Sequence, residues 1–301
     1  MDRIVAQVGG IVLGKEQQIR LALSCLLARG HLLIEDIPGV GKTMLAHALA
    51  TSLGLGFQRI QFTSDLLPAD ILGISIYDRE AHAFQFHPGP IFTQLVLADE
   101  VNRATPKAQS ALLEAMEEHQ VTIEGETRRL PHPFFVIATQ NPSTQVGTFP
   151  LPESQLDRFL MCIELGYPDA SAERELLRGE DRRDLLDTLT PCIEVKTLIE
   201  LQKRARGVHT SAALLDYVQA IVGHTRRAGD YPNGLSPRAA LALVQAARAW
   251  ALMAGREHVV PEDVQAVLTG VVGHRLTVAG ALGRVNRADL VKHLIERVPI
   301  P

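Results

Sequence analysis

The sequence predicts an α/β fold with a parallel sheet in its first part, followed by a smaller all-α domain. Short apolar runs alternate with segments of helical period as far as residue 164, a pattern typical of parallel strands that are covered on both faces. After about Asp184, strand patterns nearly vanish and helical spacing continues. The charged stretch 178–184 lies between the two parts. We therefore expect two domains, residues 1–185 and residues 186–301.

The expected elements follow one another in a regular order. Buried strands are expected at 31–35, 57–62, 95–99, 134–139 and 161–164, with hairpins at 74–86 and 120–130. The spacing of apolar residues predicts helices in the first domain at 14–29, 41–53 and 105–119. The same spacing predicts helices in the second domain at 195–206, 211–227, 236–254, 261–272 and 286–297.

The segment Asp36-Ile-Pro-Gly-Val-Gly-Lys-Thr43 follows the strand at 31–35 and opens a helix, which is the layout of a P-loop. Backbone N–H groups of such a turn and the positive helix end bind phosphates. Lys42 is expected to reach the β- and γ-phosphates and the Thr43 hydroxyl to bind Mg²⁺. The alternative, a corner without a ligand, is disfavoured by the strand and helix on either side.

One position departs from the usual pattern G-x-x-x-x-G-K-[ST], because Asp36 stands where the first glycine is expected. Aspartate tolerates the left-handed backbone conformation better than most residues. We therefore expect the turn to form in spite of the change.

Polar residues follow two of the later strands. Asp99 and Glu100 end the strand at 95–99, and Asn141 follows the strand at 134–139. Ligands of open α/β sheets bind beyond the carboxyl ends of the strands. Asp99 is therefore placed to hold Mg²⁺, and Glu100 to orient or deprotonate the attacking water. The Asn141 amide is placed to contact the γ-phosphate or that water, although an Asn-Pro pair by itself favours a simple turn.

Two arginines are candidates for binding the γ-phosphate, because the guanidinium fork is always charged and bidentate. Arg158 lies on an expected short helix before the last strand. Arg238 begins a helix of the second domain, with Ser236 as its cap and Pro237 in its first turn. From spacing alone, surface salt bridges are the better explanation for both arginines.

Composition excludes several classes of protein. The net charge of −4 argues against a surface for non-specific nucleic-acid binding. No apolar run is long enough for a membrane helix, and no secretory signal is evident. The three cysteines are far apart, without metal-binding spacing, and we expect core thiols at Cys25 and Cys162 in a reducing cytoplasm.

The complete chain resembles the MoxR family of AAA+ ATPases. The likeness rests on five segments in this order, all read from the sequence: the P-loop 36–43, the run 89–116 with its Walker B acids Asp99 and Glu100, the sensor 1 segment 138–142, the arginine-finger segment 151–159, and the sensor 2 segment 234–238.

The resemblance implies the remaining site residues. It implies an αβα core with a helical lid, and ATP bound between them and against a neighbouring subunit of a hexamer. Arg158 would then act in trans and Arg238 in cis, and Arg103 would signal between subunits. The hairpins at 74–86 and 120–130 would be the helix-2 and pre-sensor-1 inserts. The nucleotide would contact Val12, Leu13, Pro38, Gly39, Val40, Gly41, Lys42, Thr43, Met44 and Arg238.

The resemblance also implies partners. MoxR-like proteins are chaperone-like ATPases that work with proteins carrying a von Willebrand factor A domain on a client protein, and we expect no direct nucleic-acid binding and no membrane insertion. Two alternatives stay open. One is a slow nucleotide-dependent assembly switch, and the other is a subunit of a magnesium-chelatase-like or DNA-linked motor.

Overall fold

A five-stranded parallel sheet forms the core of the first domain, as the sequence predicts. The computed structural model describes residues 1–141, 149–179, 181–277 and 286–300. The strand order is β2 (Phe57–Gln61), β5 (Leu95–Asp99), β8 (Phe135–Gln140), β1 (Leu32–Glu35) and β9 (Met161–Ile163). Each neighbouring pair is parallel, so the carboxyl ends of all five strands meet at one edge.

Helices cover both faces of this sheet, because successive strand residues point to opposite sides. Leu32 and Ile34 of β1 belong to one apolar cluster, while Leu33 between them belongs to another. The first cluster packs against α1 (Asp2–Gly9), α2 (Glu16–Leu27), α3 (Lys42–Ser52) and the lid. The second packs against α4 (Pro68–Leu72) and α5 (Pro106–Glu118). The helices α1 and α4 were not expected from the sequence.

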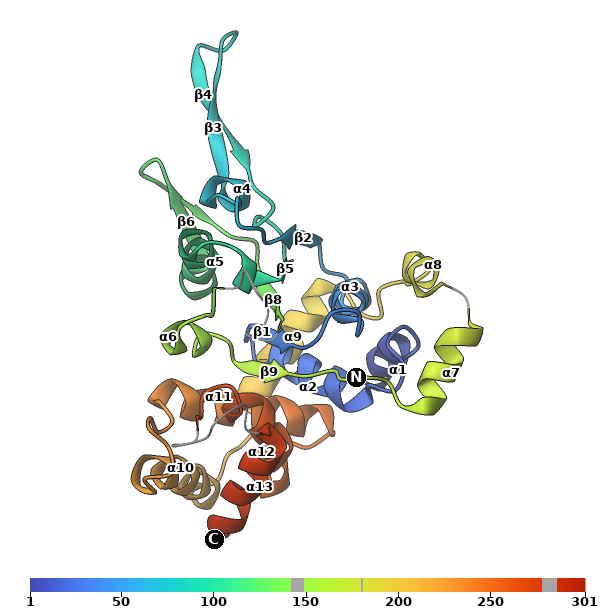
Figure 1. Cartoon of the computed structure of the whole chain (residues 1–301), viewed down its shortest axis with the longest axis vertical. Helices are drawn as coiled ribbons and strands as arrows, with labels where there is room; N and C mark the ends of the chain where they lie inside the picture. The colour runs from blue at the N-terminus through green and yellow to red at the C-terminus, as the bar shows by residue number, and fades with distance from the viewer. Residues whose placement is uncertain (142–148, 180, 278–285, 301) are drawn as a thin grey trace.

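Two antiparallel hairpins project from the sheet domain, both as predicted (Figure 1). One pairs β3 (Gly73–Asp78) with β4 (Ala83–Pro88), and the other pairs β6 (Gln120–Ile123) with β7 (Glu126–Arg129). Ring contacts join Tyr77 to Phe84 and Phe86 to Phe92, at centroid distances of 5.3 and 5.6 Å.

The described residues after β9 are mainly helical, which confirms the predicted change of pattern. The lid contains α9 (Val195–Gly207), α10 (Ala212–Arg227), α11 (Pro237–Met253), α12 (Pro261–Val272) and α13 (Arg287–Arg297). Helices α10 to α13 lie beneath β9 in Figure 1, whereas α9 extends above it in this view. α11 packs against α2 and α9, and α12 packs against β9. Ser236 caps α11 by accepting the Ala239 N–H at 3.1 Å.

Along the chain, two further helices lie between the last strand of the sheet domain and the lid. They are α7 (Ala170–Arg178) and α8 (Arg182–Asp187), and α8 packs beside α3. The predicted boundary at 185/186 falls inside α8 and stays a prediction. No helix among the described residues is long and apolar enough to cross a lipid bilayer.

Candidate nucleotide site

The P-loop connects β1 to α3 by a turn that needs two glycines. Gly39 and Gly41 have φ angles of 87° and 91°, in a region that L side chains rarely adopt. A Cβ added at Gly39 would meet no atom within 4 Å. The requirement for glycine at this position is therefore conformational, and the space above it stays open for a ligand.

Asp36 has a different role from the one expected. Its φ is not positive, so tolerance of the left-handed conformation does not explain why it replaces the first glycine. Its carboxylate accepts the N–H groups of Leu165 at 2.7 Å and Gly166 at 2.6 Å, and also the N–H of Ile37 at 2.8 Å. The side chain thus joins the start of the P-loop to the segment that follows β9.

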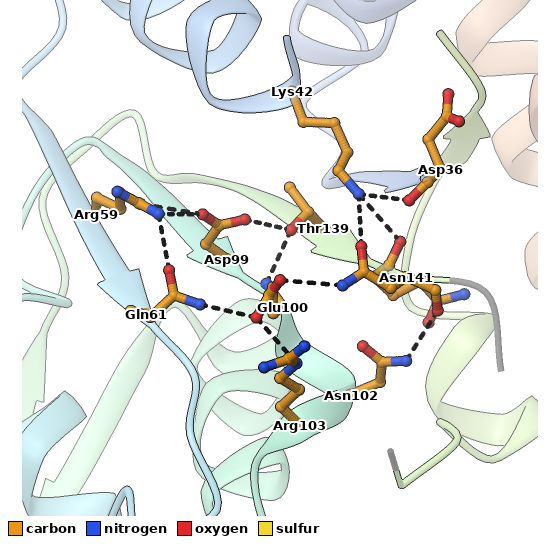
Figure 2. Close-up of polar contacts among 11 residues, drawn as sticks. Asp36, Lys42, Arg59, Gln61, Asp99, Glu100, Asn102, Arg103, Thr139 and Asn141 are labelled. Atoms are coloured by element: carbon orange, nitrogen blue, oxygen red, sulfur yellow. Dashed lines mark hydrogen bonds and ion pairs between the residues drawn. The ribbon is translucent and has the colours of Figure 1, made fainter. Parts of the chain in front are cut away.

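Lys42 points its ammonium group across the carboxyl edge of the sheet (Figure 2). Nζ donates to the Asp36 carbonyl at 2.6 Å and to Asn141 Oδ1 at 3.0 Å. Burial lowers the pKa of Lys42, while the neighbouring carboxylates of Asp36, Asp99 and Glu100 oppose that shift. The charge is thus held in place by oxygen atoms of the protein, close to where phosphates would lie.

Asp99 lies at the end of β5 and is fully engaged. Oδ1 accepts the Thr139 hydroxyl at 2.5 Å, and Oδ2 accepts Arg59 Nε at 3.0 Å and a second guanidinium N–H at 2.6 Å. Arg59 comes from β2, where Gln61 pairs in register with Asp99. The sequence did not point to these partners, although polar residues alternate with Ile60 along β2.

Glu100 follows Asp99 with a left-handed backbone, at a φ of 56°. Its carboxylate accepts Asn141 Nδ2 at 3.0 Å and Gln61 Nε2 at 3.2 Å, and it forms an ion pair with Arg103 at 3.0 Å. The Glu100 N–H donates to the Thr139 hydroxyl at 2.8 Å. The expected base is therefore fixed by three side chains, two of which were not identified from the sequence as its neighbours.

Asn141 bridges the two charged groups that matter most for phosphate chemistry. Its amide oxygen accepts from Lys42 and its amide nitrogen donates to Glu100, both at 3.0 Å. Asn102 holds the backbone of Asn141 by donating to its carbonyl at 3.0 Å. A simple turn residue would need neither contact. The role of Asn141 at the nucleotide site stays a prediction.

The two candidate arginines meet at one carboxylate, far along the chain from the P-loop. Arg158 follows α6 (Glu153–Leu156), donates to the Leu113 carbonyl at 2.6 Å and pairs with Glu117 at 3.1 Å. Arg238 pairs with the other oxygen of Glu117. We call Arg158, Glu117 and Arg238 the arginine cluster.

The arginine cluster lies at the amino edge of the sheet. Arg158 comes just before β9 begins at Met161, whereas the P-loop begins where β1 ends. Since β1 and β9 are parallel, the two sites lie at opposite edges. This placement fits a role of Arg158 in trans. It gives no support to a role of Arg238 on the ATP of its own chain.

Two cavities adjoin the P-loop. The first, of about 270 Å³, has mainly apolar walls, and we call it the apolar cavity. The expected base-binding residues Val12 and Leu13 line it with Val40, Met44 and Pro168, and the charged residues Lys15, Asp181, Arg182 and Arg183 line it as well. The second, of about 530 Å³, is polar and is lined by Pro38, Lys42, Thr43, Asp99, Glu100 and Asn141. The expected P-loop, Walker B and sensor 1 residues thus converge on one pair of cavities.

Oxygen donors suited to a magnesium ion lie in the polar cavity. Thr43, with its hydroxyl, and Asp99, with its carboxylate, are among the residues that line it, and Mg²⁺ is commonly held by one or two such groups together with phosphate oxygens. The residues therefore fit the ion, with the condition that Arg59 must share or release Asp99 when the ion binds.

Comparison with known proteins agrees with this geometry. Residues 31–161 match the ATPase family associated with various cellular activities (AAA), and residues 224–294 match the AAA lid domain. YeaC of Bacillus subtilis is 43% identical, over all of this chain and 95% of its own. The chaperone MoxR1 of Mycobacterium tuberculosis is 38% identical, over all of this chain and 82% of its own.

A solved structure is also similar. A candidate ATPase from Cytophaga hutchinsonii has 37% sequence identity and a TM-score of 0.90, and the match covers all of this chain and 94% of that one. The P-loop, the acids at the end of β5, the lid and these relatives together identify the activity and the family. The chain is an ATP-hydrolysing enzyme and belongs to the MoxR family of AAA+ ATPases.

Proposed function

We propose that this ATPase works as a ring, a hexamer, in which each ATP lies between the P-loop of one subunit and the arginine cluster of the next. The observation that carries the proposal is the separation of Lys42 and Arg158 at opposite edges of one sheet. An interface between unlike faces closes into a ring when its rotation permits. Such a ring brings the two edges together once per subunit pair.

The side chains at the P-loop edge divide the work of hydrolysis. Lys42 neutralises phosphate charge, and Glu100 orients the attacking water, while Asn141 keeps both in register through its amide. When bound through Thr43 and Asp99, Mg²⁺ would supply Lewis-acid stabilisation of the phosphate oxygens. Arg158 and Arg238 of the neighbouring subunit would add positive charge at the γ-phosphate, where phosphoryl transfer needs it.

We further propose that hydrolysis drives chaperone-like remodelling or maturation of a client protein, together with a partner that carries a von Willebrand factor A domain. The support is the family, including a relative named as a chaperone. The exposed β3–β4 hairpin projects furthest from the sheet domain (Figure 1) and offers a surface for such a contact. We place this activity in the cytoplasm.

The experiment that tests the proposal is Glu100→Gln. The amide keeps the shape but cannot act as a base, so we expect turnover to fall by about a hundredfold or more while ATP binding is kept. The variant should form a stable ring in ATP, visible by light scattering, and should retain client and partner in a pull-down.

Unchanged turnover of Glu100→Gln would refute the assignment of Glu100. Steady-state turnover of the wild type with and without captured partner separates a remodelling enzyme from a slow assembly switch. An increase on adding the partner supports the remodelling enzyme, and an unchanged slow rate supports the switch.

A further inference from the structure

Arg183 lies where the two cavities beside the P-loop meet. The residues that line both cavities are Gly39, Gly41, Met44 and Arg183. Among these four, Arg183 alone carries a charge. A nucleotide with its base in the apolar cavity and its terminal phosphates near Lys42 has its ribose and α- and β-phosphates at this junction.

The guanidinium of Arg183 is free to take a ligand. The side chain is exposed, and its guanidinium forms no ion pair or hydrogen bond with any residue within 1–141, 149–179, 181–277 or 286–300. The backbone N–H of Arg183 donates to Asp181 Oδ1 at 2.9 Å. Its neighbour Arg182 is engaged instead, by donating to the Gly10 carbonyl at 3.0 Å and to Glu175 at 3.3 Å. Arg59, the other arginine of the polar cavity, is paired with Asp99.

The helix that carries Arg183 is anchored to the nucleotide-binding half of the chain. α8 packs against α3, the helix that follows the P-loop. Leu186 of α8 is buried in the same apolar cluster as Leu45 and Leu49 of α3. The contact between Arg182 and Gly10 fixes the start of α8. Arg183 is therefore held beside the P-loop before any nucleotide arrives, which lowers the entropic cost of binding.

We propose that Arg183 binds the α- and β-phosphates of the nucleotide held by the P-loop of its own chain. It thereby provides the cation in cis that Arg238, at the opposite edge of the sheet, does not. A guanidinium fork donates two parallel hydrogen bonds to phosphate oxygens. The inference rests on the P-loop site of the proposed function, and it concerns binding of both ADP and ATP.

The test compares Arg183→Ala with the wild type and with Arg178→Ala, a matched control. Arg178 is an exposed arginine of α7 that lines neither cavity. The dissociation constants of fluorescent mant-ADP and mant-ATP are measured with magnesium, and unlabelled adenosine is measured by displacement. We expect Arg183→Ala to raise the dissociation constants of ADP and ATP by about tenfold or more. The dissociation constant of adenosine and the melting temperature of the free protein should not change.

Arg183→Lys keeps the charge but not the guanidinium fork, so its affinity for ADP and ATP should lie between those of the wild type and Arg183→Ala. The inference is overturned if Arg183→Ala binds ADP as tightly as Arg178→Ala does. It is also overturned if Arg183→Ala weakens the binding of adenosine as strongly as that of ADP, because Arg183 would then contact the base or the ribose. Failure of the wild type itself to bind mant-ADP would instead refute the P-loop site.

Discussion

The polar and charged side chains at the two edges of the sheet differ in burial and in how firmly they are held. At the P-loop edge, Lys42, Asp99 and Asn141 are 7%, 6% and 3% exposed, and each is held by at least two hydrogen bonds. At the amino edge, the side chains of Arg158, Glu117 and Arg238 are 30%, 36% and 47% exposed.

Only the P-loop edge has its charged groups fully held within one chain. The P-loop edge is preorganised, as a site must be if it stabilises charge during reaction. The arginine cluster is half in water, where ion pairs are worth little, so its arginines can exchange Glu117 for a stronger anion at modest cost. In the proposed ring, the first edge would receive ATP and the second would be presented to the ATP of another subunit.

The largest effect is expected from Arg158→Ala, because a missing arginine finger costs about a thousandfold or more in turnover. Equimolar mixing with Lys42→Ala subunits then tests the separation of the edges. If the arginine acts in trans, about a quarter of the interfaces in a random mixture regain both residues. ATPase activity should therefore reappear on mixing. Arg129→Ala, an exposed arginine of β7, serves as the control and should keep full activity.

A mixture no more active than its separate components would contradict the assignment of the two edges to different subunits. Light scattering of the same mixture shows whether rings form. It therefore distinguishes a failure to assemble from a failure of Arg158 to act on the ATP of a neighbouring subunit.

Asp36→Gly restores the usual P-loop pattern but should destabilise the P-loop edge. It leaves the N–H groups of Leu165 and Gly166 without their carboxylate, and unpaired buried donors cost about 1–3 kcal/mol each. We expect the free energy of unfolding, measured in urea, to fall by about 3 kcal/mol. Asp36→Asn keeps one acceptor oxygen and should lose less. A stability equal to the wild type for Asp36→Gly would show that these hydrogen bonds contribute nothing.

Acid should destabilise the amino edge through His31. Its Nδ1 accepts the Val136 N–H at 2.9 Å and its Nε2 contacts the Met116 carbonyl at 3.0 Å, next to Glu117. Burial lowers the pKa of His31 from 6.5 to about 4. The unfolded state therefore binds more protons between these values, so stability falls as the pH falls through that window.

The expected loss in the free energy of unfolding between pH 7.5 and pH 5 is about 2 kcal/mol from His31. Urea unfolding at the two pH values measures it. His31→Phe should be less stable at pH 7.5 but should show a smaller difference between the two. His82→Ala, which removes an exposed histidine of the β3–β4 turn, should keep the wild-type difference. Equal differences for His31→Phe and the wild type would exclude His31 as the source.

The smallest effect is expected from Glu117→Gln. The neutral amide keeps its size but holds both guanidinium groups less firmly, so turnover should fall by up to about tenfold while mant-ADP binding is unchanged. Turnover is measured at saturating ATP. A rise in turnover would show that Glu117 withholds the arginines from the neighbouring ATP and does not position them.

Much of the fold followed from local patterns. Apolar runs such as Leu95–Ala98 predicted buried strands, and the P-loop glycines predicted the turn. The N-terminal helix α1 was missed, because only Ile4, Val5 and Val8 mark its buried side and the pattern is short. Residues that follow strands, such as Asp99 and Asn141, were predicted for the site because parallel strands end at one edge.

Other site residues depend on tertiary packing. Arg59 and Gln61 reach the Walker B acids through the register of β2 with β5, and Arg183 reaches the P-loop because α8 packs against α3. Glu117 joins Arg158 of the sheet domain to Arg238 of the lid. Sequence spacing contains no measure of these distances. It favoured surface salt bridges for both arginines but could not name Glu117 as their shared partner.

Asp36 shows how a mismatch can be informative in comparing sequences. A pattern that scores each position separately counts the missing glycine as a loss, yet the carboxylate is matched by two N–H groups about 130 residues further along the chain. The two places form one hydrogen-bonded unit. In relatives that carry an acid at this position, the chain leaving the edge strand should therefore return to the P-loop, and in relatives with glycine it is released from that constraint.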